Sequence, residues 1–176
     1  MPKIIDEARK KILESARKKL LSEGYGAVSL REIARECSIA VGTIYNYFDS
    51  KDSLVASIML DDWFQALSEM DEGIAASDGI TDGIIEIHAA VERFSSIYRE
   101  VWSQFLQSGG SSSEVDSRHL MLRGQIEEKI RSLLARNGRR EDAGFAPILA
   151  ELVLAIGPRT DISGKQLSDF LNRFFQ

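Results

Sequence analysis

Residues 29–51 of this chain read Ser-Leu-Arg-Glu-Ile-Ala-Arg-Glu-Cys-Ser-Ile-Ala-Val-Gly-Thr-Ile-Tyr-Asn-Tyr-Phe-Asp-Ser-Lys, and this stretch decides the fold. Ser29 and Glu32 have the spacing of a capping box, which predicts that a helix begins at about Leu30. One apolar stripe follows at i, i+3 and i+4: Leu30, Ile33 and Ala34. A polar stretch around Glu36 and Ser38 then interrupts this pattern, which predicts a tight turn.

A second short helix is predicted to begin after the turn and to direct Ile44 and Phe48 inward, with Ile39 filling the corner between the two helices. The side chains that remain on its outer side are mostly hydrogen-bonding groups, which suit phosphate and base-edge contacts in a DNA major groove. These candidate contacts are Thr43, Tyr45, Asn46 and Tyr47. A solvated helix face is the alternative interpretation, but it would leave two neighbouring tyrosines exposed.

Another, longer helix is predicted to begin at Lys51, with Ser50 as its N-cap. A lysine in the first turn of a helix opposes the helix dipole, so its position calls for an explanation. A DNA phosphate at this helix end would supply one, because the free N–H groups and the ammonium would both point at it. The alternative is a solvated lysine.

Residues 12–55 resemble the DNA-binding domain of the TetR family of bacterial transcriptional regulators. The residues that carry the resemblance are Ile12-Leu13-Glu14-Ser15-Ala16, Gly24-Tyr25-Gly26, Ile33-Ala34, Gly42-Thr43-Ile44-Tyr45, Tyr47-Phe48 and Ser50-Lys51. The resemblance implies a first helix packed across the helix-turn-helix pair and a fourth helix leading to a ligand-binding core. It also implies DNA contacts at Ser29, Thr43, Tyr45, Asn46, Tyr47 and Lys51, with a close approach of the backbone to phosphate at Gly42.

Three positions depart from the family pattern. Ser38 stands where glycine is common in the turn, and a left-handed conformation there would cost about 1 kcal/mol. Ala40 stands where a serine often caps the recognition helix, which gives up about 1 kcal/mol of capping. Val41 replaces a residue that is commonly polar, and it could contact a thymine methyl group. The operator sequence therefore cannot be transferred from the family.

Composition favours an all-α protein with two functional parts. The chain has 176 residues, only three prolines and no alternating strand-like runs. Residues 1–51 hold ten Lys or Arg against seven Asp or Glu, whereas residues 52–176 hold twelve against twenty. A basic head on an acidic body is expected of a DNA-binding domain joined to a separate core. We therefore predict a three-helix helix-turn-helix DNA-binding domain over 1–51 and a helical ligand-binding and dimerisation domain over 52–176.

The last two predicted helices indicate self-association. Residues 145–156 are apolar nearly all round, and such a helix must be covered on all sides. A final helix from about Ser163 carries an apolar stripe. The predicted dimer interface comprises Leu149, Leu152, Val153, Ile156, Leu167, Phe170, Leu171 and Phe174. Two such helices could pair with their copies in a two-fold four-helix bundle, as the family resemblance also implies. In the alternative, a monomer, both helices would cover their own core.

A long amphipathic helix, predicted over residues 81–107, carries the candidate effector site. His88, Tyr98 and Trp102 bring polar groups to its apolar face, a mixture that is typical of ligand pockets. Each could instead be a core residue with one hydrogen-bond partner. A metal sensor built on His88, Glu92 and His119 is a weaker alternative, because there is no tighter ligand cluster. The Ser108–Ser113 run is predicted to be a loop, and a helix is expected over 114–136.

Other classes of protein find little support. The sequence has no G-x-x-x-x-G-K-S/T loop, G-x-S-x-G elbow or H-E-x-x-H pair, so neither an enzyme nor a cofactor is expected. No signal peptide or membrane-spanning run is apparent, and the single cysteine, Cys37, fits a reducing cytoplasm better than a disulfide. A redox switch at Cys37 is less favoured than a small residue filling a packing site.

The sequence thus predicts a cytoplasmic homodimeric repressor that binds a near-palindromic operator and is released by a small-molecule effector. The alternative is a helical protein-interaction module with weak or lost DNA binding, an idea that Ala40 and Val41 keep open.

Overall fold

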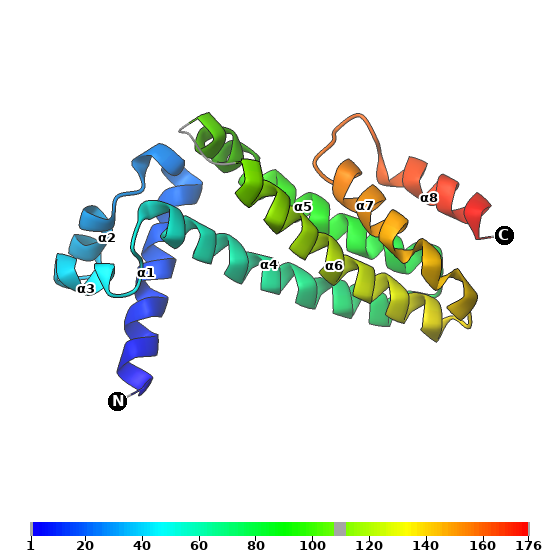
Figure 1. The fold of residues 1–176 in the computed structure, drawn as a ribbon, viewed down its shortest axis with the longest axis horizontal. Helices are drawn as coiled ribbons and strands as arrows, with labels where there is room; N and C mark the ends of the chain where they lie inside the picture. Colours follow the sequence, from blue (N-terminus) through cyan, green and yellow to red (C-terminus); the bar gives the residue numbers. More distant parts are fainter. Residues whose placement is uncertain (1, 108–111, 176) are drawn as a thin grey trace. The chain divides into compact units, whose positions relative to one another are not determined.

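The computed structural model describes residues 2–107 and 112–175, and these residues form helices and turns with no strand among them. The N-terminal helices are α1 (Pro2–Glu23), α2 (Leu30–Glu36) and α3 (Val41–Tyr45), with a short 3₁₀ turn, η1 (Tyr25–Ala27), after α1. The chain continues through α4 (Lys51–Ala76), α5 (Ile80–Gln107) and α6 (Ser112–Arg136). A second 3₁₀ segment, η2 (Arg140–Phe145), leads to α7 (Ala146–Ile156) and α8 (Gly164–Phe174). The all-α prediction is therefore confirmed (Figure 1).

The helix bounds agree closely with those predicted. The helices predicted to begin at Leu30 and at Lys51 begin there, and Asn137 and Gly138 follow the end of α6 as expected. Residues 108–111 of the predicted loop lie outside the described residues, and the last two residues of that loop belong to α6, which begins at Ser112.

The helix N-termini show which predicted caps form. At Ser50, the hydroxyl accepts from the Ser53 N–H at 3.1 Å, and the Ser53 hydroxyl accepts from the Ser50 N–H at 3.2 Å. The Ser29 hydroxyl, in contrast, makes no cap hydrogen bond, and Glu32 pairs with Lys19 Nζ at 2.9 Å. The predicted capping box at Ser29 is therefore wrong, because an ion pair with α1 holds the carboxylate that would have completed it.

The chain divides into two compact units. The first comprises Met1–Phe64 with Glu100–Gly109, and the second comprises Gln65–Arg99 with Gly110–Gln176. The predicted boundary after residue 51 thus lies inside the first unit. The reason is that the first half of α4 packs on α1, where Arg17 Nε meets Asp62 Oδ2 at 2.9 Å and Arg9 lies 3.9 Å from Asp61. Both α4 and α5 contribute residues to both units.

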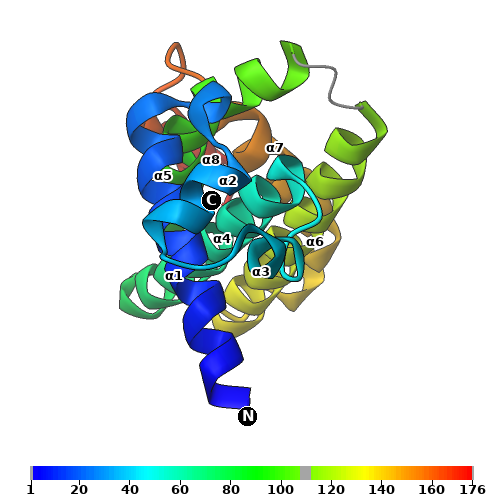
Figure 2. The same cartoon turned by 90° about the vertical axis from the view of Figure 1, so that its left-hand side faces the viewer.

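The core of the first unit is built from the predicted apolar stripes. Figure 2 shows α2 and α3 joined by their turn, with α1 beside them. The buried side chains of the three helices and η1 are Ile12, Leu13, Ala16, Leu20, Tyr25, Leu30, Ile33, Ala34 and Ile44. Phe48, which follows α3, is also buried, and α4 adds Leu54, Val55 and Ile58.

In the second unit, glycines allow the helices to approach one another closely. A Cβ on Gly73 of α4 would lie 2.7 Å from Glu86 Cβ of α5, and one on Gly83 of α5 would lie 2.6 Å from Leu133 of α6. A Cβ on Gly157, just after α7, would lie 2.6 Å from Val91 Cγ1. The close approaches at these glycines join α4 to α5, α5 to α6, and the end of α7 to α5, and the sequence pattern alone did not indicate them.

Candidate DNA interface and effector site

The turn between α2 and α3 is a Schellman motif. Ser38 has a φ of 55°, the left-handed conformation expected where the family has glycine, and its N–H donates to Arg35 O at 3.1 Å. The Ile39 N–H donates to Ala34 O at 2.9 Å. This motif ends α2 abruptly and directs the chain into α3.

The predicted groove contacts lie on and around α3. Ile44 is buried beneath this helix, which leaves Val41, Gly42, Tyr45 and Asn46 exposed, with exposed fractions of 41% at Val41 and 45% at Tyr45. Ser29, Thr43, Tyr47 and Lys51 are half-buried. A Cβ at Gly42 would meet no atom within 4 Å, so its backbone is open to an approaching group. Ala40 occupies the N-cap of α3 without a side-chain hydrogen bond, as predicted.

The acidic and the basic residues of α2 differ in their contacts. Glu32 lies 2.9 Å from Lys19 Nζ, and this hydrogen bond lowers the pKa of the carboxyl and raises the pKa of the lysine. Glu36 accepts from the Ser15 hydroxyl at 2.6 Å. Arg31 and Arg35 are exposed. The acids are thus occupied by α1, and the two arginines are further candidate phosphate contacts.

Arg31 and Arg35 were not among the contacts predicted from the sequence, although their i, i+4 spacing makes them neighbours on the surface of α2.

The Lys51 side chain contacts Tyr25, a residue of the same unit. Its ammonium lies 3.9 Å from the centroid of the Tyr25 ring and donates to Tyr25 O at 3.4 Å. The Tyr25 hydroxyl donates to the carboxylate of Asp52. The start of α4 is therefore tied to η1. The phosphate contact of Lys51 stays a prediction, and the structure adds a defined position from which the ammonium could make it.

Cys37 lies at the end of α2 and is half-buried, with its sulfur 3.6 Å from Lys11 O. Burial raises the pKa of the thiol, which lowers the fraction of reactive thiolate. This environment favours the packing role over the redox switch.

The three predicted pocket residues occupy different environments. His88 is only 3% exposed and its Nε2 makes no hydrogen bond with the described residues. Burial lowers the pKa of His88, with Glu92 opposing the shift. Tyr98 is fully buried and its ring lies 5.1 Å from that of Phe94. Trp102 belongs to the first unit and is half-buried, with its ring 5.8 Å from that of Phe105.

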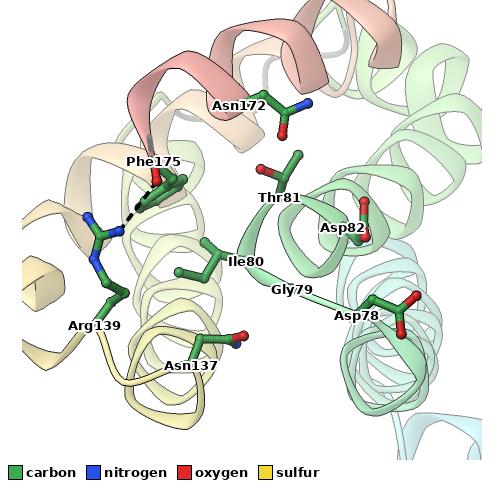
Figure 3. Close-up of a pocket in the computed structure, with 9 residues that line it drawn as sticks. All are labelled: Asp78, Gly79, Ile80, Thr81, Asp82, Asn137, Arg139, Asn172 and Phe175. Atoms are coloured by element: carbon green, nitrogen blue, oxygen red, sulfur yellow. Dashed lines mark hydrogen bonds between the residues drawn. The ribbon is translucent and has the colours of Figure 1, made fainter.

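A polar cavity of about 410 Å³ lies elsewhere in the second unit (Figure 3). It is lined by Asp78, Gly79, Ile80, Thr81, Asp82, Asn137, Arg139, Asn172 and Phe175. Arg139 lies at one side of it, where its Nη1 donates to Phe175 O at 3.4 Å and its Nε lies 2.7 Å from Asp142 Oδ2. None of the predicted pocket residues lines this cavity. His119, considered with His88 for a metal site, instead pairs with Glu151 at 2.9 Å.

The residues of the predicted dimer interface differ in their exposure within one chain. Leu149, Val153, Ile156, Leu167 and Leu171 are buried within one chain, so they cannot offer surface to a second one. Leu152 is half-buried, and Phe170 and Phe174 are exposed, together with Ile148 and Phe145, which were not predicted. The physical reason is that the inner rows of α7 and α8 are used by their own core.

Comparison with known proteins connects this geometry to one family. Residues 12–58 match the family described as bacterial regulatory proteins, tetR family. The HTH-type transcriptional regulator UidR of Escherichia coli (strain K12) is 24% identical over 149 residues, which cover 82% of this chain and 76% of that protein. The HTH-type transcriptional regulator HbdR of Aromatoleum sp. (strain CIB) is 34% identical over 76 residues, 42% of this chain and 33% of that protein.

Solved structures share the fold. A transcriptional regulator of the TetR/AcrR family from Thermobifida fusca YX-ER1 superposes with a TM-score of 0.60 at 18% identity, covering 96% of each chain. Salmonella enterica GusR superposes with a TM-score of 0.64 at 18% identity, covering 96% of this chain and 93% of its own.

Among the residues that the structure describes, no helix combines the length and apolar character needed to cross a membrane.

Proposed function

Because the chain belongs to the TetR family of DNA-binding transcriptional regulators, we propose that it binds a near-palindromic operator as a homodimer and represses until a small-molecule effector releases it. The observation that carries the proposal is the outer side of α3. Tyr45 and Asn46 are exposed there, over a helix anchored by the buried Ile44. Two such helices, one from each chain, would enter successive major grooves about one helical turn apart.

In the proposed interface, side chains of α3 contact base edges, and the groups around it contact phosphates. Tyr45, Asn46 and Val41 are assigned to bases, since Val41 and Tyr45 are exposed on α3 and Asn46 is exposed at its C-cap. Ser29, Gly42 and Lys51 are assigned to phosphates, with Thr43 and Tyr47 at the edge of the groove. Basic residues in the head reinforce these contacts electrostatically.

The first experiment is selection from random duplex DNA with the purified protein, followed by titration of the enriched duplex at two salt concentrations. We expect a near-palindrome that binds two chains and weakens steeply as salt rises, because counterions are released from the DNA. Failure to enrich any sequence at low salt, with and without candidate effectors, would refute operator binding and favour the protein-interaction alternative.

Single substitutions test the assigned roles. Lys51→Ala should weaken binding to every sequence alike and reduce the salt slope by about one per chain. Asn46→Ala and Tyr45→Ala should relax base preference and cost about 1–3 kcal/mol at the enriched site. Lys165→Ala, which removes an exposed lysine from α8, is the matched control for charge. Equal losses across all sequences for the three head variants would contradict the division into base and phosphate contacts.

The proposed dimer uses an exposed apolar surface on α7 and α8. Ile148 is 65% exposed and Phe170 is 51% exposed, and the Phe170 ring stacks 6.2 Å from that of Phe174. An adjacent groove of about 490 Å³ is lined by Arg123, Pro147, Ile148, Glu151, Leu152 and Ala155. A clustered apolar surface of this kind is expected to be covered by a partner.

Sedimentation of the full chain tests the dimer. The wild-type chain should sediment as a dimer, and Ile148→Asp should yield monomers that keep the helical content, because a charge cannot be buried unpaired at the interface. Ser132→Asp, which adds the same charge at an exposed position on α6, is the control. A monomeric wild-type chain, or an Ile148→Asp chain that stays dimeric, would contradict the proposed interface.

The proposed effector pocket contains His88 and Tyr98, both of which belong to the second unit. The support is that His88 Nε2 is buried and finds no hydrogen-bond partner among residues 2–107 and 112–175, which leaves an unsatisfied polar group inside an apolar region. Release would follow if the effector binds better to a conformation whose heads do not fit the operator.

A screen for compounds that raise the melting temperature and release the duplex identifies the effector class. Its action should be lost in His88→Phe and kept in Asn172→Ala, a variant of the separate polar cavity. The reverse result would move the effector site to that cavity.

A reporter gene downstream of the enriched duplex should be less expressed when the protein is present, and higher expression would identify an activator.

A further inference from the structure

Tyr25 is contacted both by the start of α4 and by the end of α5. It is 4% exposed, and its ring meets the Phe105 ring edge-on at a centroid distance of 6.1 Å. The Lys51 ammonium lies 3.9 Å from the centroid of the same ring, and the Tyr25 hydroxyl donates to the Asp52 carboxylate. All of these residues belong to the first unit. One buried ring therefore connects the last turns of α5 to the lysine at the start of α4.

The Tyr25 ring fixes where the Lys51 ammonium lies. A cation above an aromatic ring is attracted by the electron-rich face, and the attraction is stronger where the site is partly shielded from water. Lys51 is half-buried, and its ammonium also donates to Tyr25 O at 3.4 Å. Two interactions with the same residue therefore limit the positions open to this flexible side chain.

Gln104 of α5 holds the turn that carries Tyr25. The Gly26 N–H donates to Gln104 Oε1 at 3.3 Å, and Gln104 Nε2 donates to Glu100 Oε1 at 3.0 Å. Gly24 has a φ of 86°, and a Cβ there would lie 3.2 Å from the Gln104 amide. The backbone on both sides of Tyr25 is thus fitted to one side chain of α5.

We infer that Tyr25 is a positioning residue for Lys51 and that the end of α5, through Gln104 and Phe105, sets the position of Tyr25. This inference rests on the proposed phosphate contact of Lys51. Helix α5 is one continuous helix, and its residues Ile80–Arg99, which include His88, belong to the second unit. An effector that shifts or rotates α5 thereby displaces the Lys51 ammonium without having to move α4 along its whole length.

The test compares Gln104→Ala with Gln107→Ala in the full chain. Gln107 is an exposed glutamine on the same helix, and its Nε2 donates to Ser103 Oγ of that helix at 3.2 Å, so its replacement controls for residue type and helix propensity. The first readout is the NMR signal of the Lys51 side chain in lysine-labelled protein, assigned with Lys51→Arg. The Tyr25 ring should shift this signal upfield, and Gln104→Ala should reduce the shift whereas Gln107→Ala should not.

The second readout is affinity for the enriched duplex. Gln104→Ala should raise the Kd by about tenfold with unchanged base preference and a smaller salt slope, since one charge-assisted contact per chain is weakened. Tyr25→Phe keeps the ring and should retain most of the Lys51 shift. If Gln104→Ala matches Gln107→Ala in both the Lys51 signal and the Kd, the inference is wrong.

The two proposals can fail separately. If the wild-type chain enriches no duplex, DNA binding fails, and the Lys51 signal still decides whether α5 positions this lysine. If the signal moves but the Kd does not, Lys51 makes no phosphate contact and the regulatory part of the inference is refuted.

Discussion

Replacing Ser38 by glycine should stabilise the protein, because this serine is held in a backbone conformation that glycine adopts without cost. Its φ is 55°, and it is the one residue other than glycine with positive φ among those described. The chain contains the same motif a second time, after α6. There Gly138 has a φ of 75° and donates to Ala135 O at 3.2 Å, while the Arg139 N–H donates to Leu134 O at 2.9 Å.

The magnitude follows from two opposing effects. A left-handed conformation costs a residue with a Cβ about 1–2 kcal/mol. Glycine gains about 0.5–1 kcal/mol of conformational entropy in the unfolded chain, which offsets part of that strain. Ser38→Gly should therefore raise the free energy of unfolding by up to about 1 kcal/mol, equivalent to about 2–4 °C in melting temperature for a chain of this size. Gly138→Ser should lower it by a similar amount, since a Cβ there meets no atom within 4 Å and only the backbone strain counts.

Urea unfolding followed by circular dichroism measures both changes. Ser38→Ala is the control, because it keeps the Cβ and removes only the hydroxyl, so its stability should match that of the wild type. The difference in free energy of unfolding between the glycine and alanine variants isolates the contribution of the backbone conformation at position 38. If Ser38→Gly is no more stable than Ser38→Ala, the strain assigned to this turn is absent and the argument fails.

Three further predictions concern packing and titration. Gly157→Ala should lower the free energy of unfolding by about 1–3 kcal/mol, because the added methyl would lie 2.6 Å from Val91. Gly124→Ala, within α6 and with open space around it, should instead raise the free energy of unfolding by about 0.5–1 kcal/mol. The opposite order of stabilities in urea titrations would contradict the packing. Cys37 should react more slowly with a thiol reagent at pH 8 than a free cysteine does, because burial raises its pKa, and a rate equal to that of the urea-unfolded chain would exclude this. Burial holds the pKa of His88 below its ordinary value of 6.5, so the unfolded chain binds more protons and stability should fall as the pH decreases below about 6.5. The free energy of unfolding should therefore differ less between pH 5.5 and pH 7.5 in His88→Phe than in the wild type. An equal pH difference in the two proteins would show that His88 does not cause it.

The local pattern determined most of the DNA-binding head. Leu30, Ile33 and Ala34 are buried as their spacing predicts, and Ile44 is buried on the inner side of α3. The left-handed turn at Ser38 also formed as expected. These features depend on neighbours three or four residues apart, and the sequence specifies such contacts directly.

Only the tertiary structure decided which side chains pair with residues far away in the sequence. Glu32 has the spacing for a cap, yet it pairs with Lys19 because α1 places an ammonium within 2.9 Å. The contact of Gln104 with the Tyr25 turn joins residues about eighty positions apart, and no local pattern encodes it.

The last helices show the same limit most clearly. Helix α7 is apolar on nearly every side, so it has no single stripe that separates an inner from an outer row. The structure buries Val153 and leaves Ile148 exposed, although both have similar aliphatic side chains. Periodicity can locate an apolar face only when a polar face stands opposite. Where that contrast is missing, the packing of neighbouring helices alone decides which residues form the core and which remain available to a partner.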